Sequence, residues 1–408
     1  MSAVPVVELG GVTTKVGSGA TPRGGEAAYK PSGIPLIRSM NVHFDGFRRD
    51  GLAFLDEEQA RALKNVEVRA GDVLLNITGA SIGRVTVAPT AMDGARVNQH
   101  VCIIRPDQHL DSSFLRWYLA APSQQRLING IESGATRQAL TKEKILGFEV
   151  PLFPLSRQRE IVAEIEKQFS RLDDAVANLK RVKANLKRYK AAVLDAAVKG
   201  RIGPDDAEGD DGMPRDWHWS TVGELAVVGT GATPARSNDA FYRGGTIPWV
   251  TSSAVNEPFI DTADQFVTDE ALRNTNLTLY PPGTLLVAMY GEGKTRGKCS
   301  ELRIAATTNQ ALAALQVDSA VRPWLKLFFE HNYNNTRRIA SGGVQPNLNL
   351  GLLRSIRLPR PPVNKQHRIV AEVDRRLSIV REVEAEVDAN LKRAQALRQA
   401  VLTRAFRG

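Results

Sequence analysis

The chain has 408 residues, 42% of them hydrophobic, a formal net charge of +10 and two cysteines. This length and apolar share allow about two to four globular units with cores of their own. The two cysteines, Cys102 and Cys299, exclude a disulfide framework and a cysteine zinc site and suit a reducing cytoplasm. The basic excess favours a polyanionic partner such as nucleic acid, and the lack of any long apolar run predicts a soluble, cytoplasmic protein.

The first region, residues 1–155, shows short β-branched runs punctuated by glycine and proline, with a helical pattern near residues 113–127. It opens with a glycine-rich turn, Gly17-Ser18-Gly19-Ala20-Thr21-Pro22. Ile34-Pro35, Gly71-Asp72-Val73-Leu74-Leu75 and Asn98-Gln99 follow. These patterns predict a mixed α/β domain rich in short strands.

Residues 156–200 are predicted to form one long helix. Pro151 and Pro154 come directly before it, and proline cannot continue a helix backwards. Apolar residues recur at steps of mostly three, four or seven, and at about 1.5 Å per residue the helix would reach about 60 Å. The apolar positions are Ile161, Ile165, Phe169, Leu172, Val176, Leu179, Leu186, Tyr189 and Val193.

After an acidic surface linker at residues 201–216, residues 217–362 repeat the first region, with a helical pattern near residues 324–338. The matching segments are residues 229–234, Ile247-Pro248, residues 283–287 and Asn309-Gln310. Residues 363–408 are predicted to form a second long helix, because residues 366–408 align with residues 158–200 without a gap. Its apolar positions are Ile369, Val373, Leu377, Val380, Val383, Val387, Leu391, Ala394, Leu397 and Val401.

This duplication predicts two similar halves related by approximate two-fold symmetry. We expect two copies of a mixed α/β (α+β) domain and two long antiparallel coiled-coil helices, which would hold the domains at opposite ends of a rod. The alternative is that each helix packs back on its own domain. The residues that the halves share indicate scaffold, and the differences fall in loops, as expected if each half reads something different.

The order of these motifs, their duplication and the paired helices resemble the specificity (S) subunit of type I restriction-modification systems, over nearly the whole chain. The resemblance implies two target-recognition domains, each binding one half of a split sequence in double-stranded DNA. It also implies that the helices space the half-sites and dock two methyltransferase (M) subunits, in a complex with restriction/translocase (R) subunits. Adenine methylation would belong to the partners, which would hold S-adenosylmethionine, ATP and Mg.

The sequence contains no recognisable catalytic motif. A methyltransferase would need a glycine-rich cofactor loop and an Asn/Asp-Pro-Pro-aromatic motif, and neither is present. Gly293-Lys294-Thr295 lacks the glycine that a phosphate-binding loop requires where Ala288 stands. The six histidines show no spacing typical of metal ligands. We therefore expect no metal site and no cofactor in this chain.

Polar residues that follow the shared strands are the candidates for reading DNA, because Arg and Lys bind guanine edges and Asn and Gln bind adenine edges. Simple solvent exposure is the alternative for each of them. In the first domain they are Arg38, Ser39, Asn41, Asn76, Thr78, Ser81, Arg137, Gln138 and Lys142. In the second domain they are Thr251, Ser252, Tyr290, Lys294, Arg296, Gln345 and Asn347. Asn98-Gln99 and Asn309-Gln310 are shared by both halves, which favours a structural or phosphate-binding role.

Basic residues in the first helix either bind phosphates between the half-sites or form the solvated face of the coiled coil. They are Lys180, Arg181, Lys183, Lys187, Arg188 and Lys190. The expected target is two short blocks separated by unread base pairs, about 10 base pairs from centre to centre if both domains face the same side. Two other functions stay open: a coiled-coil scaffold that joins two protein-binding domains, and an enzyme whose site the sequence does not reveal.

Overall fold

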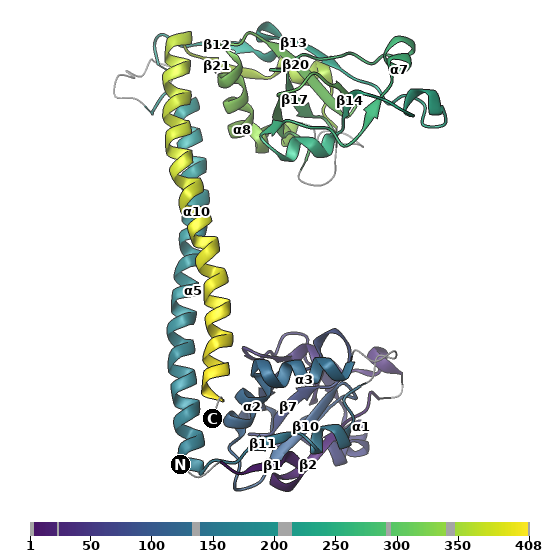
Figure 1. The fold of residues 1–408 in the computed structure, drawn as a ribbon, viewed down its shortest axis with the longest axis vertical. Helices are drawn as coiled ribbons and strands as arrows, with labels where there is room; N and C mark the ends of the chain where they lie inside the picture. Colours follow the sequence, from purple (N-terminus) through teal and green to yellow (C-terminus); the bar gives the residue numbers. More distant parts are fainter. Residues whose placement is uncertain are drawn as a thin grey trace. The chain divides into compact units, whose positions relative to one another are not determined.

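The computed structural model describes residues 4–22, 24–132, 139–202, 214–290, 295–339 and 347–406. They form two compact units: Met1–Lys180 with Asp388–Gly408 (the first unit), and Arg181–Val387 (the second unit). Each unit holds one domain of strands and short helices together with a segment of each long helix, α5 (Leu155–Val198) and α10 (Val363–Ala405) (Figure 1). The predicted linker at residues 201–216 falls mostly outside the described residues.

The first domain is built on a four-stranded antiparallel sheet in the order β2-β10-β7-β8: Thr13–Ser18, Val101–Pro106, Val73–Asn76 and Val85–Val87. A second sheet has the order β6-β3-β9: Ala53–Leu55, Ile34–Ile37 and Arg96–Val97, with β3 parallel to β9. Two small pairs are β1–β11, Val6–Glu8 with Glu149–Pro151, and β4–β5, Val42–His43 with Gly46–Phe47. The helices are α1 (Glu57–Ala62), α2 (Ser112–Ala120), α3 (Pro122–Glu132) and α4 (Lys142–Leu146).

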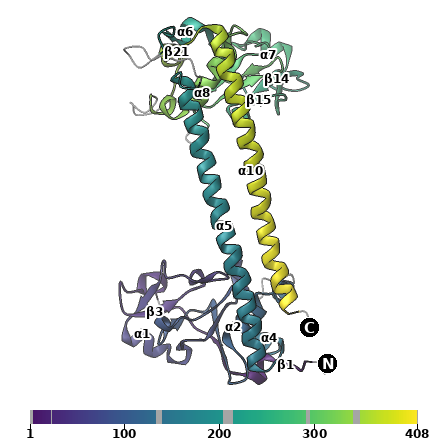
Figure 2. The same ribbon diagram turned by 90° about the vertical axis from the view of Figure 1, so that its left-hand side faces the viewer.

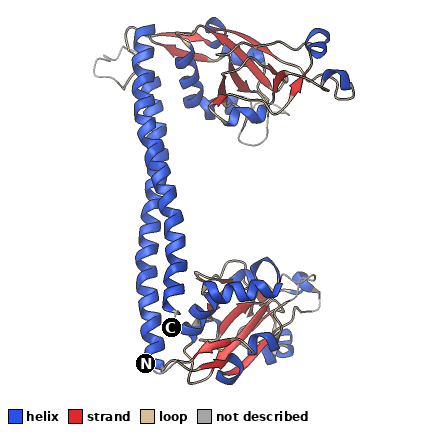
Figure 3. Cartoon of the chain, viewed as in Figure 1, coloured by secondary structure: helices blue, strands red, loops and turns tan. Residues whose placement is uncertain are grey.

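The second domain repeats the order of the main and smaller sheets and adds a fifth strand, β15, to the main sheet. Its main sheet has the order β13-β20-β17-β18-β15: Ala226–Thr230, Leu312–Val317, Leu285–Ala288, Cys299–Leu302 and Phe259–Ile260. The smaller sheet is β16-β14-β19 (Phe266–Val267, Ile247–Val250, Thr307–Thr308), and β12 pairs with β21 (His218–Thr221 with Arg357–Arg360). The helices are α6 (Val222–Leu225), α7 (Asp269–Asn274), α8 (Arg322–Ile339) and α9 (Leu350–Ser355). Figure 3 shows the strands of each domain gathered between its helices.

The central strand of each main sheet is buried on both faces, as expected for a continuous apolar run. In β7, Val73 and Leu75 face the core formed with α2, and Leu74 faces the core on the other side. In β17, Leu285 and Val287 face the core formed with α8, and Leu286 faces the other core. The alternation of side chains along a strand therefore builds the same two-sided core in both domains.

The two long helices expected from the sequence repeat are confirmed. In the first unit, Phe169 and Leu172 of α5 share a core with Val401 and Leu402 of α10. In the second unit, residues 193–198 of α5 share a core with residues 369–377 of α10. Figures 1 and 2 show these segments side by side and antiparallel within each unit.

The alternative, in which a helix packs on a domain, is also seen in part. Ile161, Ile165 and Phe169 of α5 belong to the same core as the first domain's α2. Val193 and Leu194 of α5 belong to the same core as the second domain's α8. The ends of the helices therefore bury their apolar residues against both the other helix and a domain.

The predicted apolar stripe of α10 is wrong at two positions. Val383 and Leu397 are 37% and 52% exposed, whereas Val380, Val387 and Ala394 are buried. The buried residues recur every seven positions, which keeps them on one seam of a helix with 3.6 residues per turn. A residue three positions further lies about 60° to the side of that seam, so Val383 and Leu397 turn towards solvent. Tyr189 of α5 is likewise 47% exposed.

The starts of the two helices are built alike. Gln158 and Gln366 occupy equivalent places in the repeat, and both side chains are completely buried. Gln158 Nε2 donates to the carbonyl oxygen of Phe153, and Gln366 Nε2 donates to that of Pro361, both at 2.7 Å. Each amide thus ties the first turn of its helix to the proline-bearing segment before it.

Within the described ranges, no helix has the length and apolar character needed to cross a bilayer.

Candidate nucleic-acid interface

Backbone hydrogen bonds in the first domain bring four segments together at one edge of the sheets. The N–H of Asn98 donates to the carbonyl oxygen of Ile37 at 3.1 Å. The N–H of Ile77 donates to His100, and that of Leu140 donates to Ile77, both at 3.0 Å. The ends of β3 and β7, the turn before β10 and the segment before α4 therefore meet at what we call the first edge.

The second domain has the same frame. The N–H of Asn309 donates to the carbonyl oxygen of Val250 at 3.1 Å. Met289 donates to Ala311 at 2.8 Å, and Leu348 donates to Met289 at 3.1 Å. These bonds correspond one for one to those of the first domain and define the second edge. The described segments that lie next to the predicted polar residues are therefore joined in the same way in both halves.

Residues shared by the halves hold this frame together. Gly19 and Gly231 approach neighbouring backbone so closely that a Cβ would collide with the carbonyl oxygen of Val97 or of Thr308. The hydroxyl of Thr21 donates to Oε1 of Gln99, and that of Thr233 donates to Oε1 of Gln310 at 2.5 Å. The shared Gly-x-Thr and Asn-Gln motifs thus contact each other, which favours the structural role for the Asn-Gln pairs.

Two predicted asparagines of the first domain are buried and hydrogen-bonded within the protein. Asn41 is completely buried; its Oδ1 accepts from the N–H of Arg38, and its Nδ2 donates to the carbonyl oxygens of Arg48 and Asp50. Asn76 is also buried, and its Nδ2 donates to the carbonyl oxygen of Ser39 at 2.9 Å. Buried amides that are hydrogen-bonded in this way shape the loop.

Arg38 is anchored by its guanidinium group. Nη1 lies 3.1 Å from Oε1 of Glu26, and Nη2 donates to the carbonyl oxygen of Gly51 at 2.6 Å. The Tyr29 ring lies below it, 5.3 Å from the guanidinium carbon to the ring centroid. The side chain is 18% exposed, so part of the cation remains at the first edge.

Four other predicted residues of the first domain are described and are at least partly accessible. Ser39, Thr78 and Ser81 are partly exposed, and Lys142 is exposed at the start of α4. Arg137 and Gln138 lie outside the described residues.

In the second domain, Thr251, Ser252, Arg296 and Asn347 are partly exposed, and Tyr290 is 37% exposed. The Thr251 hydroxyl shares a hydrogen bond with Ser253 at 3.0 Å. The carbonyl oxygen of Arg296 accepts from Nη1 of Arg337 on α8 at 3.2 Å, which fixes the backbone of this loop. Lys294 and Gln345 lie outside the described residues.

His100 is an edge residue that the sequence reasoning missed. It directly follows the shared Asn98-Gln99 pair, and its ring hydrogen-bonds Thr78 and Gln99. The corresponding residue after Asn309-Gln310 is Ala311. The available signal was a difference between the halves next to a shared motif, which a search for metal spacing does not detect.

The basic residues at positions 180, 181, 183, 187, 188 and 190 of α5 are all exposed. They lie on a stretch that contains no acidic residue. Their exposure is compatible with both predicted roles, phosphate contact and a solvated helix face.

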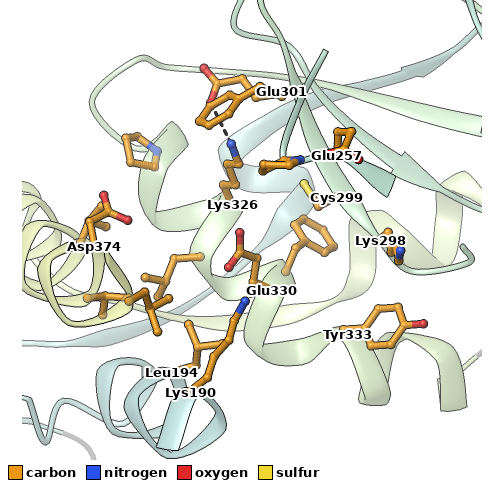
Figure 4. A pocket seen from close by; sticks show the side chains of 18 of the residues that line it. Lys190, Leu194, Glu257, Lys298, Cys299, Glu301, Lys326, Glu330, Tyr333 and Asp374 are labelled. Carbon is orange, nitrogen blue, oxygen red and sulfur yellow. Dashed lines mark hydrogen bonds and ion pairs between the residues drawn. The ribbon is translucent and has the colours of Figure 1, made fainter. Parts of the chain in front are cut away.

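The second unit also contains a cleft of about 1120 Å³ between α8, β18 and the segments of α5 and α10 (Figure 4). Apolar side chains line it, together with charged groups such as Lys190, Glu330 and Asp374. Glu301 is bound by Arg322 at 3.2 Å and by Lys326 at 3.4 Å.

The thiol that lines the cleft is not activated. Burial raises the pKa of the Cys299 thiol well above its usual range, although Lys326 opposes the shift, so the sulfur stays protonated and poorly nucleophilic at neutral pH. Among the residues that the structure describes, no three His, Cys, Asp or Glu side chains come close enough to hold a metal ion.

A duplicated fold in which shared residues build the frame and edge loops differ defines a two-domain recognition protein. The chain belongs to the type I restriction modification DNA specificity domain family, whose model matches residues 1–188 and 214–389. As a DNA specificity subunit of a type I restriction-modification system, it is itself noncatalytic. In this family the cofactors belong to the methyltransferase and restriction subunits.

Among curated relatives, the chain is 21% identical over 398 residues to the EcoKI specificity subunit of Escherichia coli (strain K12), covering 92% of this chain and 82% of the relative. It is 25% identical over 336 residues to the Escherichia coli EcoBI specificity subunit, covering 77% and 69%. The match to the Escherichia coli EcoR124I/EcoR124II specificity subunit is 23% identical over 225 residues and covers 54% of this chain and 52% of the relative. The chain thus spans about half of that last relative.

Two solved structures share the fold. One chain, from a structure on complex assembly and conformational transition of the type I R-M system, has a TM-score of 0.77 at 20% identity and covers 100% of both chains. The HsdS subunit from Thermoanaerobacter tengcongensis has a TM-score of 0.63 at 21% identity and covers 99% of this chain and 96% of that one. At these identities the likeness establishes the arrangement of elements.

Proposed function

We propose that each domain reads one block of a two-part double-stranded DNA target through its edge. The observation that carries this proposal is the pair of identical backbone frames that present different side chains. A contact to phosphate can be the same in both domains, but a contact that specifies a base must differ when the bases differ. The two frames place their loops in the same geometry, and the different side chains in those loops would give each domain its own base specificity.

The proposed reading set comprises the predicted residues of each domain other than Asn41 and Asn76. For the first block it comprises Arg38, Ser39, Thr78, Ser81, Arg137, Gln138 and Lys142. For the second block it comprises Thr251, Ser252, Tyr290, Lys294, Arg296, Gln345 and Asn347. We leave Asn41 and Asn76 out because both side chains are buried and their Nδ2 groups already donate to backbone carbonyls, and we assign them the role of holding the first edge loop.

The long helices are proposed to set the distance between the two blocks and to dock two methyltransferase subunits, with restriction subunits completing the complex. α5 has 44 residues and α10 has 43, so each is about 65 Å long. Their outward residues, including Val383 and Leu397, leave apolar surface that a partner can cover. We place the complex in the cytoplasm, where its DNA substrate lies.

Long-read methylation mapping of the native genome, with the gene intact and deleted, tests the proposal. We expect one bipartite methylated motif to vanish on deletion and to return on complementation. Complementation with a chain carrying Thr251→Ala, Ser252→Ala and Tyr290→Phe should relax one block of the motif and leave the other unchanged. A motif that persists without the gene, or two blocks that relax together, would contradict the proposal.

The rival scaffold function predicts a different result. A scaffold that joins two protein-binding domains would show no strong, salt-sensitive binding to DNA when it is loaded with its partners. Measuring the affinity of the partner-loaded complex for its motif between about 50 and 200 mM salt separates the two functions.

A further inference from the structure

Four side chains at the first edge form a continuous chain of hydrogen bonds. The hydroxyl of Thr21 donates to Oε1 of Gln99. Nε2 of Gln99 lies 3.0 Å from Nε2 of His100, and Nδ1 of His100 lies 2.5 Å from Oγ1 of Thr78. This chain of hydrogen bonds therefore connects the shared scaffold to Thr78, a residue of the proposed reading set.

The donors and acceptors of this chain determine where its protons lie. Because Oε1 of Gln99 faces Thr21, its Nε2 faces His100, and an amide nitrogen can only donate. Nε2 of His100 must then accept, which places the proton of the neutral imidazole on Nδ1. Nδ1–H accordingly donates to Oγ1 of Thr78.

This arrangement leaves Thr78 with a hydroxyl proton to give. Its oxygen already accepts from His100, so its own O–H points away from the ring. The residue precedes the short turn at Gly79–Ser81, and its side chain does not cap that turn. Thr78 is partly exposed at the edge, where a ligand can reach it.

The second domain has the first hydrogen bond of this series and lacks the others. Thr233 donates to Gln310 in the same way, but Ala311 takes the place of His100. Tyr290 takes the place of Thr78, because Met289 and Ile77 make equivalent backbone bonds. The extension through His100 is therefore a property of the first domain, as expected for specificity and not for scaffold.

We propose that His100 is a positioning residue for recognition of the first DNA block. It holds Thr78 as a hydrogen-bond donor directed at an acceptor on a base edge, such as O6 or N7 of guanine, N7 of adenine or O4 of thymine. This inference rests on the proposed function of the first edge.

The test uses the full chain assembled with its methyltransferase subunits and measures methylation rates on target duplexes. The first block is varied one base pair at a time, and the second block is varied as an internal control. For His100→Ala and for Thr78→Val we expect discrimination at one base pair of the first block to fall about 2- to 10-fold, the effect of one hydrogen bond. The double variant should fall no further than either single variant, because both remove the same contact.

Conservative variants and a matched control refine the test. Thr78→Ser keeps the hydroxyl and should retain discrimination, and His100→Asn, which keeps a donor near the Nδ1 position, should restore part of it. His109→Ala changes an exposed histidine of the same domain and should have no effect. All variants are compared in amide hydrogen exchange, so that a loss of folding is recognised, and Thr78→Val, which preserves shape, carries the test if His100→Ala unfolds.

Three results would overturn the inference. Unchanged first-block discrimination in Thr78→Val would show that its hydroxyl reads no base. An equal loss of rate on every duplex would show that the hydroxyl contacts a phosphate. Additive effects in the double variant would show that His100 does not act through Thr78. If the unsubstituted complex itself shows no preference in the first block, the proposed function fails instead.

Discussion

Nη2 of Arg398 on α10 lies 2.7 Å from Oδ1 of Asp173 on α5, directly beside a buried aromatic contact. The same guanidinium group stands over the Phe169 ring, with its carbon 4.6 Å from the ring centroid. Phe169 is 6% exposed and makes an edge-to-face contact with Trp117 at 4.9 Å, whereas Asp173 is 61% exposed. The ion pair between Arg398 and Asp173 lies at the surface, and the Phe169–Trp117 pair lies buried beneath it.

Phe169→Ala should therefore destabilise the first unit far more than Arg398→Ala. Truncating a buried phenylalanine costs about 3–5 kcal/mol, while an exposed ion pair contributes about 1 kcal/mol or less. Hydrogen exchange of the amides in residues 155–180 and 388–405 gives the local unfolding free energy of each variant. Equal losses of protection in the two variants would show that the ion pair contributes as much as the aromatic contact and would contradict this prediction.

Gly19→Ala should disrupt the first edge, because the added methyl group collides with the carbonyl oxygen of Val97. We expect a loss of about 1–3 kcal/mol or more in the stability of the first unit, with weaker recognition of the first block. Gly17→Ala is the matched control, since a Cβ there has no atom within 4 Å. Thermal unfolding followed by hydrogen exchange measures both. A Gly19→Ala variant as stable as Gly17→Ala would contradict the close approach.

The two thiols should react slowly in the folded protein. Burial raises the pKa of Cys102 to about 12 and also raises the pKa of Cys299, so almost no thiolate is present at pH 8. Reactivity should increase only when the pH rises well above the pKa of a free thiol, about 8.5. With an aromatic disulfide reagent at pH 8, Cys299 should react before Cys102, because it lines the open cleft while Cys102 is 2% exposed. Both should react at once in guanidinium chloride. Immediate reaction of both in the native protein would contradict their burial.

Arg38→Ala and Arg296→Ala should affect different blocks of the target. If each cation contacts a guanine edge, its loss should reduce discrimination in its own block by about 1–3 kcal/mol and leave nonspecific affinity nearly intact. Glu26→Gln is the control for Arg38, since it weakens the ion pair at 3.1 Å but keeps the guanidinium group. Methylation rates on duplexes altered in one block provide the measurement. Uniform loss on all DNA would assign the residue to phosphate contact.

The sequence repeat predicted the long helices well because a fixed offset and an uninterrupted apolar period are local patterns. A local pattern does not determine which polar residues at an edge stay accessible, because that depends on the tertiary fold. Asn41 and Thr78 both follow a strand, but Asn41 is buried because the turn near Arg48 and Asp50 folds over it. The role of His100 depends on its contacts with Thr78 and Gln99. Those contacts form only because the end of β7 is hydrogen-bonded to the turn before β10.

The frame held by Gly19 with Val97, and by Gly231 with Thr308, is made from backbone and from the smallest residue. Its geometry therefore does not depend on which side chains the neighbouring loops carry. Substitutions in those loops can accumulate without loosening the sheets beneath them, so that a new target can be acquired by a few loop changes in one half while the other half keeps its own. A chain built this way separates the freedom to evolve from the need to stay folded.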